Sequence, residues 1–505
     1  MSRRRRPRQT KVNVEETVPE VNDNETSVEV SVPPNSVAVA LAGKKLLDAA
    51  PPPFIENPVS NITLNHLHRY FESPVVDGEL RPIKGNENTR IVATLQFVIC
   101  GDGTLLGGQS GSAKSEIMKA MIVLVWGDEG MDGKNPDLGV VKPGSKKAIY
   151  SRKFSEMIQR CSRVWVPEWQ NAKDYEPMFK LWLEGRNGAY DMRDVTDKED
   201  DMKETDLPPR PIMTSLAEAN EIMPDLTNEM KRRVVTLHTR SDQALNDQVH
   251  EMKAEMRRIP DEELEKLGEN ETYGLQAILL GAKAEQRRVI NPASTLIRKA
   301  VPNKYTASNT FIDYWFNLIE AIAKFYKNDR VTTDRYIFAT PGDNYVAFTL
   351  AADIFRDLAL GMPPCGDDIL TMIPITDTWG DLKGDNKSDR RNIDQVVTAL
   401  DEMGVPRTKV VVESYMEKLL GAGYVNIDKE KLYYRMRDIS GGDDVIDWGL
   451  VISASKEWMK SKFPEVVEEY NEQADTYIHP LSGDEENIVV KATKKKPKSG
   501  GLGNV

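Results

Sequence analysis

Residues 107–115 combine the side-chain types and spacing best suited to chemistry in this sequence. They read Gly-Gly-Gln-Ser-Gly-Ser-Ala-Lys-Ser, with Gly108 six positions before Lys114. Backbone N–H groups of a glycine-rich turn can surround phosphate oxygens when a strand precedes the turn and a helix follows it. The lysine then reaches the β and γ phosphates, and the next hydroxyl binds Mg²⁺. The segment therefore predicts a nucleotide site.

The flanking sequence supports this interpretation, because residues 104–106 form a strand candidate and residues 116–126 continue as a helix. Ala113 stands where such loops usually have their last glycine. A Gly/Ser turn that only caps a helix is the alternative. The predicted ATP-binding residues are Gly108, Gln109, Ser110, Gly111, Ser112, Ala113, Lys114 and Ser115, and Ser115 is also the predicted Mg²⁺ ligand.

The form Gly-x-x-Gly-x-Ala-Lys-Ser resembles the phosphate loop of the minichromosome-maintenance (MCM) helicases and of the related MoxR-like and magnesium-chelatase ATPases, all of them AAA+ proteins. Residues 90–100 also resemble the helix that leads into that loop in the helicases. The resemblance covers residues 88–239 at the level of motifs. It implies an ATP-hydrolysing homo-oligomer, a hexameric ring that uses Mg²⁺ and moves along or unwinds DNA in replication.

A second motif of this family is present in altered form. In the family an apolar strand ends in Asp-Glu, where the aspartate supports Mg²⁺ and the glutamate polarises the attacking water. Residues 163–168 read Arg-Val-Trp-Val-Pro-Glu, so Glu168 is the predicted general base and Pro167 replaces the aspartate. Mg²⁺ would then depend on Ser115, phosphates and water, since this ion keeps several waters. An ordinary residue at a strand end is the alternative for Glu168.

Two further catalytic roles follow from the resemblance. The strand candidate 211–216 and the following Asn220 resemble sensor 1, whose polar residue orients the lytic water; Thr214 and Ser215 compete with Asn220 for this role. Arg232 and Arg233 end a helix at the position of the arginine finger, which stabilises charge at a neighbouring subunit's γ-phosphate. A basic pair at a helix end also simply complements the helix dipole.

The predicted DNA contacts lie in two regions. In the helicases, a helix and then a pore hairpin follow the second motif; residues 175–183 are the helix candidate here, and Arg186 and Arg193 are candidate contacts. The stretch 197–206 is acidic, so a solvated loop is the alternative.

Residues 388–438 predict a winged helix, with helices over 393–400 and 409–419 and a hairpin around 428–431. MCM helicases also end in a winged helix. Its predicted DNA contacts are Lys409, Lys431 and Arg435, and docking of a protein is the alternative role.

Composition excludes several classes of protein. The 67 basic and 79 acidic residues give a net charge of −12, which argues against a general basic nucleic-acid coat. Longer apolar runs stop well short of the roughly 20 residues of a membrane helix. Cys100, Cys161 and Cys365 lie far apart without a CxxC pair, which argues against a disulfide scaffold or zinc ribbon and favours a reducing compartment. We expect a cytoplasmic location at the nucleoid, or a nuclear one in a eukaryote.

The expected fold class is α/β: a AAA+ phosphate-loop core with a parallel sheet, a helical lid, a C-terminal winged helix and disordered charged tails. The predicted boundaries are a tail over 1–55, the core over 60–240, the lid and connector over 241–365, the winged helix over 366–440, and a C-terminal helix with a basic tail over 441–505.

Two other functions remain open. A MoxR-like remodelling ATPase would act on protein partners, and a non-hydrolysing DNA-binding initiator would explain Pro167. Few residues precede the expected core, which fits a compact helicase of an archaeal virus, plasmid or other mobile element. Replication proteins are then expected partners alongside DNA.

Overall fold

The computed structural model describes residues 62–489 except 77, 110, 142–151, 191–201, 207, 218–226, 241, 259–271, 304–307, 361–365, 377–389, 423, 429–431 and 437–445. The chain divides into two units, Met1–Pro58 and Val59–Val505, and every described residue belongs to the second. The expected tails at 1–55 and beyond residue 489 lie outside the described residues.

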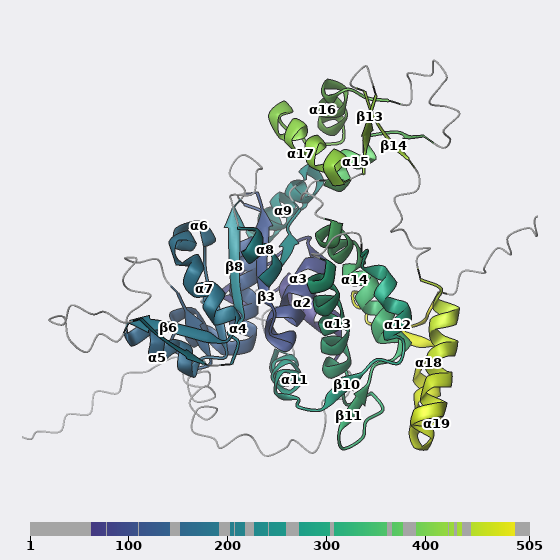
Figure 1. Ribbon diagram of the computed structural model, residues 1–505. Coiled ribbons are helices and arrows are strands. Elements are labelled where there is room, and N and C mark those ends of the chain that lie inside the picture. The colour runs from purple at the N-terminus through teal and green to yellow at the C-terminus, as the bar shows by residue number, and fades with distance from the viewer. Residues whose placement is uncertain are drawn as a thin grey trace, which may run out of the picture. The chain divides into compact units, whose positions relative to one another are not determined.

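A five-stranded parallel sheet forms the centre of the fold (Figure 1). Its strands lie in the order β4, β5, β8, β3, β9, and each neighbouring pair is parallel. Their bounds are β3 (Gly103–Gly108), β4 (Leu138–Val140), β5 (Arg163–Val166), β8 (Ile212–Ala217) and β9 (Val234–His238). The strands predicted around 104–106, 164–166 and 211–216 are confirmed, and so is the parallel α/β class.

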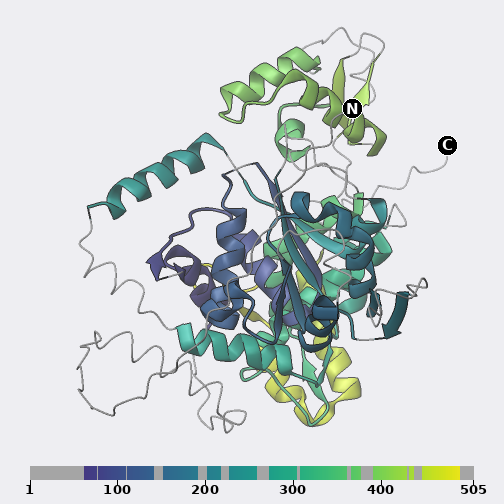
Figure 2. The ribbon, with the colours of Figure 1, turned by 90° about the vertical axis from the view of Figure 1, so that its left-hand side faces the viewer.

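Both faces of this sheet are buried, as is usual for parallel strands. Leu106 packs in the cluster with helices α3 (Glu87–Thr94) and α4 (Lys114–Asp132), whereas Leu105 points to the other face and packs with α6 (Trp169–Ala172) and α7 (Glu176–Leu183). Figure 2 views the sheet from the side with helices on both of its faces.

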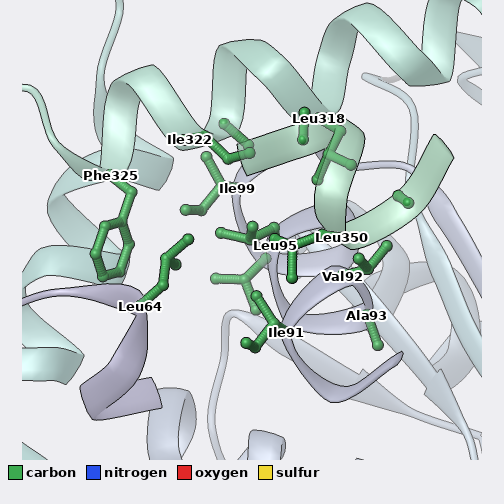
Figure 3. Packing of buried hydrophobic residues seen from close by; sticks show 14 of the residues in the cluster. Leu64, Ile91, Val92, Ala93, Leu95, Ile99, Leu318, Ile322, Phe325 and Leu350 are labelled. Atoms are coloured by element: carbon green, nitrogen blue, oxygen red, sulfur yellow. The ribbon is translucent and has the colours of Figure 1, made fainter. Parts of the chain in front are cut away.

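The helix expected over 90–100 is present in two parts. It begins as α3 and continues as the π-helix η1 (Leu95–Cys100), which ends at Gly101 in the left-handed conformation (φ 77°). Its apolar side packs against α13 (Ser308–Phe325) and α14 (Pro341–Leu360), where Figure 3 shows residues of η1 and α13 in one cluster. Large apolar residues of α13, among them Phe311, Trp315 and Leu318, are therefore part of the core.

The segment after residue 366 builds a separate small core. The parallel pair β12 (Ile375–Thr376) and β14 (Tyr433–Met436) is extended by β13 (Asn426–Ile427), antiparallel to β14. Helices α16 (Ile393–Glu402) and α17 (Lys409–Ala422) pack beside this sheet around Val396, Leu400 and Tyr415. The two helices and the hairpin expected in this region are confirmed.

The start of α16 shows how local sequence sets these boundaries. Asn392 precedes the helix and Gln395 is its third residue, the pattern of a capping box. The Gln395 N–H donates to Asn392 Oδ1, the Asn392 N–H donates to Gln395 Oε1, and both distances are 2.9 Å.

The remaining described elements lie outside the central sheet. They are α2 (Leu64–Glu72), β1 (Val75–Val76), β2 (Glu79–Leu80), α5 (Arg152–Arg160), η3 (Lys173–Tyr175), β6 (Arg186–Tyr190), β7 (Met202–Asp206), α8 (Asn228–Arg233), α9 (Gln243–Met256), α11 (Thr272–Ala284), β10 (Arg288–Ile290), α12 (Ser294–Ile297), η4 (Arg298–Ala300), β11 (Tyr336–Phe338), α15 (Gly366–Thr371), α18 (Trp448–Lys462), η7 (Pro464–Val466), α19 (Val467–Gln473), β15 (Thr476–Ile478) and β16 (Glu485–Asn487). Among the described residues, no helix is both long enough and apolar enough to cross a bilayer.

The packing of α13 against η1 can be tested by removing one buried side chain. Leu318 is fully buried in this interface, so Leu318→Ala should lower the free energy of unfolding by about 2–5 kcal/mol. Leu450→Ala in α18 is the matched control, because Leu450 is 49% exposed and surface changes stay within about 0.5 kcal/mol. Urea unfolding followed by tryptophan fluorescence gives both values. Equal losses in the two variants would contradict the assigned core.

Candidate functional site

The glycine-rich segment connects the carboxyl end of β3 to the amino end of α4, as its spacing predicts. Gly108 and Gly111 have positive φ angles of 150° and 86°, and Ala113 adopts the left-handed conformation with φ 62°. That conformation costs a residue with a Cβ about 1–2 kcal/mol. Ala113 therefore adopts a backbone conformation that favours glycine, and α4 begins directly after it at Lys114.

Lys114 is buried beneath this loop, with only 6% of its surface exposed. Its ammonium group donates to the Gly108 carbonyl oxygen at 2.7 Å, to the Gln109 carbonyl oxygen, and to Ser112 Oγ at 3.1 Å. Ser115 is exposed in the first turn of α4, and Ser110 lies outside the described residues. The loop thus holds the lysine at its centre and leaves the following hydroxyl accessible.

Glu168 lies at the same edge of the sheet as this loop. β5 ends at Val166, which pairs with Thr214 of β8, and Thr214 also pairs with Leu105 of β3. Because the strands are parallel, the residues that follow β3 and β5 share the carboxyl edge. Glu168 is exposed and accepts a hydrogen bond from Asn171 Nδ2. The predicted base therefore has an accessible carboxylate beside the phosphate-loop edge.

Ser215, Thr214 and Asn220 are the three candidates for the residue that orients the lytic water. Ser215 Oγ donates to the Pro167 carbonyl oxygen at 2.7 Å, so this hydroxyl ties β8 to the end of β5. Thr214 is buried within β8. Asn220 lies outside the described residues.

Arg232 and Arg233 lie at the opposite edge of the sheet. They end α8 immediately before β9, whose first residue pairs with Gly103 at the beginning of β3. β9 has five residues, so it spans about 16 Å at about 3.3 Å per residue. That length exceeds the reach of an arginine side chain, and neither arginine can touch the phosphate loop of its own chain.

The two arginines differ in their surroundings. Arg233 forms ion pairs with Glu184 and, at 2.9 Å, with Glu229. The Arg232 side chain is exposed, and its backbone carbonyl accepts a hydrogen bond from the Tyr314 hydroxyl at 3.1 Å. Among the described residues, Arg232 is thus better placed to meet a second molecule.

A cavity of about 590 Å³ opens beside these arginines. Asp102 lies in the wall of this cavity and is only 8% exposed. Asn317 Nδ2 donates to its two carboxylate oxygens, at 3.0 and 3.2 Å. Burial raises the pKa of the Asp102 carboxyl to about 7, against the opposing effect of the Asn317 hydrogen bond. Sequence reasoning missed Asp102; the signal was an acid between an apolar helix and an apolar strand.

The predicted DNA contacts are only partly described. Arg186 begins β6, is exposed, and belongs to an antiparallel pair with β7 at the place where the resemblance predicts a hairpin. Lys409 is exposed and pairs with Asp394 at 2.8 Å. Arg435 lies in β14 without a described side chain, and Arg193 and Lys431 lie outside the described residues.

The exposed face of α17 carries acidic as well as basic groups. Glu413 and Glu417 lie one helical turn apart there. Their charge opposes phosphate, so it reduces the suitability of this face for DNA.

The site offers, within its described residues, one protein ligand that suits Mg²⁺, the hydroxyl oxygen of Ser115. Over the described part of the chain there is no group of three or more His, Cys, Asp or Glu side chains that could hold a metal. Ser115 supplies an exposed hydroxyl at the start of α4. Mg²⁺ is commonly held by few protein oxygens together with substrate phosphates and water, so this sparse donor set is compatible with a nucleotide-borne ion.

Comparison with models of known protein families gave no match, and comparison with curated proteins gave none either.

The raised pKa of Asp102 makes a testable contribution to stability. The folded chain binds this proton more tightly than the unfolded chain does, so the stability from this group is complete below pH 4 and falls as the pH rises toward 7. Asp102→Asn should remove this pH dependence. Relative to the wild type, its free energy of unfolding should therefore rise by on the order of 3 kcal/mol between pH 4 and pH 8. Urea unfolding of both proteins across this range measures the difference.

The control for this experiment is Asp128→Asn, because Asp128 is an exposed carboxylate near the end of α4. The pH dependence that is lost in Asp102→Asn but kept in Asp128→Asn belongs to the buried carboxyl. A difference between Asp102→Asn and the wild type that does not change with pH would show that the buried carboxyl does not titrate in this window.

Proposed function

We propose that this protein is an ATP-hydrolysing, ring-forming AAA+ DNA helicase or translocase that resembles the MCM helicases and acts in DNA replication. The observation that carries the proposal is the division of the site between two edges of one sheet. Lys114 and Glu168 share the carboxyl edge, whereas Arg232 lies at the amino edge. A complete site then needs two protomers, which a ring supplies.

Each residue at the carboxyl edge has a role in this proposal. The loop N–H groups and Lys114 bind the phosphates, and the amino end of α4 adds its positive dipole. Ser115 is the protein's ligand to Mg²⁺, which, when bound, neutralises phosphate charge. Glu168 accepts the proton of the attacking water. Pro167 provides no metal ligand, so the metal depends on Ser115, phosphates and water. Asn220 remains our proposal for the residue that orients the water.

Arg232 completes the site from the neighbouring protomer. Its exposed position before β9 suits contact with a γ-phosphate on another chain, where a guanidinium stabilises the charge of the transition state. Arg233 is paired with Glu184 and Glu229, so its role in this proposal is to hold the end of α8. The region after residue 241 serves as the helical lid.

DNA is the substrate that the resemblance favours. Arg186 at the base of the β6–β7 hairpin, together with Arg193, is our proposed contact within the ring, and the basic residues near both ends of the chain add phosphate contacts. Lys409, Lys431 and Arg435 supply the winged-helix contacts. Such an activity places the protein in the cytoplasm at the nucleoid, or in the nucleus of a eukaryote.

A second candidate is a MoxR-like ATPase that remodels protein partners. Glu413 and Glu417 on the exposed face of α17 favour it, because that face suits a protein better than it suits DNA. Both candidates require hydrolysis. The third candidate, a non-hydrolysing DNA-binding initiator, does not.

DNA dependence of the ATPase separates these three functions. The helicase should hydrolyse ATP faster with single- or double-stranded DNA, and the stimulation should weaken as salt rises, because phosphate contacts release counterions. Glu168→Gln should retain ATP binding and lose about 10²- to 10⁴-fold in kcat. Turnover is measured by phosphate release over a salt series, alongside strand separation of a labelled duplex.

The outcomes of this experiment are distinct. Turnover indifferent to DNA but stimulated by a protein would support the remodelling ATPase. Equal turnover in wild type and Glu168→Gln would support the binding-only initiator, and either result would contradict the helicase.

Mixing two inactive variants tests whether Arg232 acts on a neighbouring protomer. Arg232→Ala keeps its own Glu168, and Glu168→Gln keeps its own Arg232, so one in four interfaces of a random equal mixture has both groups. The mixture should therefore recover about a quarter of wild-type turnover, whereas each variant alone should show a loss of about 10³- to 10⁵-fold for the arginine. Phosphate release measures all three samples.

Lys231→Ala is the matched control, because Lys231 is the exposed basic neighbour of Arg232 in α8. It should keep wild-type turnover by itself. A mixture no more active than its separate components would contradict a role of Arg232 between protomers.

A further inference from the structure

Thr239 immediately follows β9 and lies against the phosphate loop, 125 residues after Lys114 in the chain. It is buried, with 7% of its surface exposed. Its backbone N–H donates to the Gly107 carbonyl oxygen at 2.9 Å. Its Oγ1 lies 2.6 Å from Ser112 Oγ and 3.1 Å from the same Gly107 oxygen. The end of one strand thus contacts both the beginning and the middle of the loop.

Ser112 connects this threonine to the lysine. Its Oγ lies 2.7 Å from the Gln109 carbonyl oxygen and accepts from Lys114 Nζ at 3.1 Å. A serine hydroxyl has one hydrogen to donate, and the Gln109 carbonyl can only accept it. The Thr239 hydroxyl also has one hydrogen, which either the Gly107 carbonyl oxygen or Ser112 Oγ can accept, and the Thr239 N–H donates to Gly107 in both cases.

Gly108 shows how closely Thr239 approaches. A Cβ at this position would lie 2.3 Å from Thr239 Oγ1 and 2.9 Å from the Thr239 carbonyl oxygen. Both distances are shorter than a non-bonded contact allows. The loop thus accepts Thr239 only because its first glycine has no side chain.

We propose that Thr239 is a positioning residue of the nucleotide site, whose hydroxyl fixes the phosphate loop through Ser112. This inference rests on the proposed ATPase function. To meet a phosphate, the Lys114 ammonium must exchange bonds to the loop carbonyls for bonds to the nucleotide. The Thr239–Ser112 contact keeps the loop in place during that exchange, because one of its two hydroxyls belongs to the residue that follows β9 and not to the loop. Thr239 itself does not touch the phosphates.

The test is the affinity of the full chain for a fluorescent ATP analogue and for ADP, measured by equilibrium titration. Thr239→Val keeps the shape and removes the hydroxyl, so nucleotide affinity should fall about 3- to 12-fold, the effect of one hydrogen bond. Thr239→Ser keeps the hydroxyl and should stay within about 2-fold of wild type. All titrations are made well below the unfolding midpoint of each variant.

Thr94→Val is the matched control, because Thr94 is also buried and its Oγ1 donates to the Arg90 carbonyl oxygen at 2.9 Å, away from the loop. It should lower the unfolding midpoint and leave nucleotide affinity unchanged. A similar loss of affinity in Thr94→Val and Thr239→Val would reduce Thr239 to a structural role and overturn the proposal.

A double-mutant cycle with Ser112→Ala tests the route through Ser112. If Thr239 acts through this hydroxyl, the double variant should bind nucleotide no more weakly than the weaker single variant. If the losses of affinity in the two single variants add up in the double variant, Thr239 does not act through Ser112. A wild type that binds no nucleotide would overturn the proposed function together with this inference, whereas normal binding by Thr239→Val would overturn the inference alone.

Discussion

The pairing of β3 with β8 on one side and β9 on the other is the constraint on which the rest of the structure depends. It places the end of β3 between two buried strands, so the loop from Gly108 begins from a fixed point. Because all neighbouring strands are parallel, the same pairing brings the end of β5 to the loop edge and sends the beginning of β9 to the far edge. The distribution of Lys114, Glu168 and Arg232 over the two edges is a consequence of strand direction.

The loop and its neighbouring elements could be predicted because their signals are local. Glycine spacing, the lysine and an apolar helix lie within a few residues of one another, and the strand, the loop and α4 occur where the sequence predicts them. The same holds for α16, whose beginning depends on Asn392 and Gln395, three residues apart. The π-helical half of the helix expected over 90–100 could not be predicted, because the helix that it packs against, α13, begins only at Ser308.

The remaining features depend on contacts between residues far apart in the chain. The buried Asp102 carboxylate accepts a hydrogen bond from Asn317 of α13, 215 residues later in the chain. Arg233 is bound by Glu184, 49 residues before it, which no spacing rule indicates. From the sequence alone, Arg232 and Arg233 were therefore equally good candidates for the arginine finger. The fold distinguishes them, because it leaves Arg232 exposed and pairs Arg233 with acidic side chains. Thr239 was missed for the same reason, since its partner Ser112 is 127 residues away.

These long-range contacts give β9 a particular place in the proposed ring. Its first residue, Val234, comes two positions after Arg232, the arginine that would reach a neighbouring protomer, and its last residue precedes the threonine that contacts the loop of its own chain. A strand paired along its whole length with a buried neighbour is a stiff connection, because interiors are close-packed and transmit displacement. β9 therefore connects the end of α8 at one edge of the sheet to the phosphate loop at the other edge. Five residues of strand lie between Arg233 and Thr239.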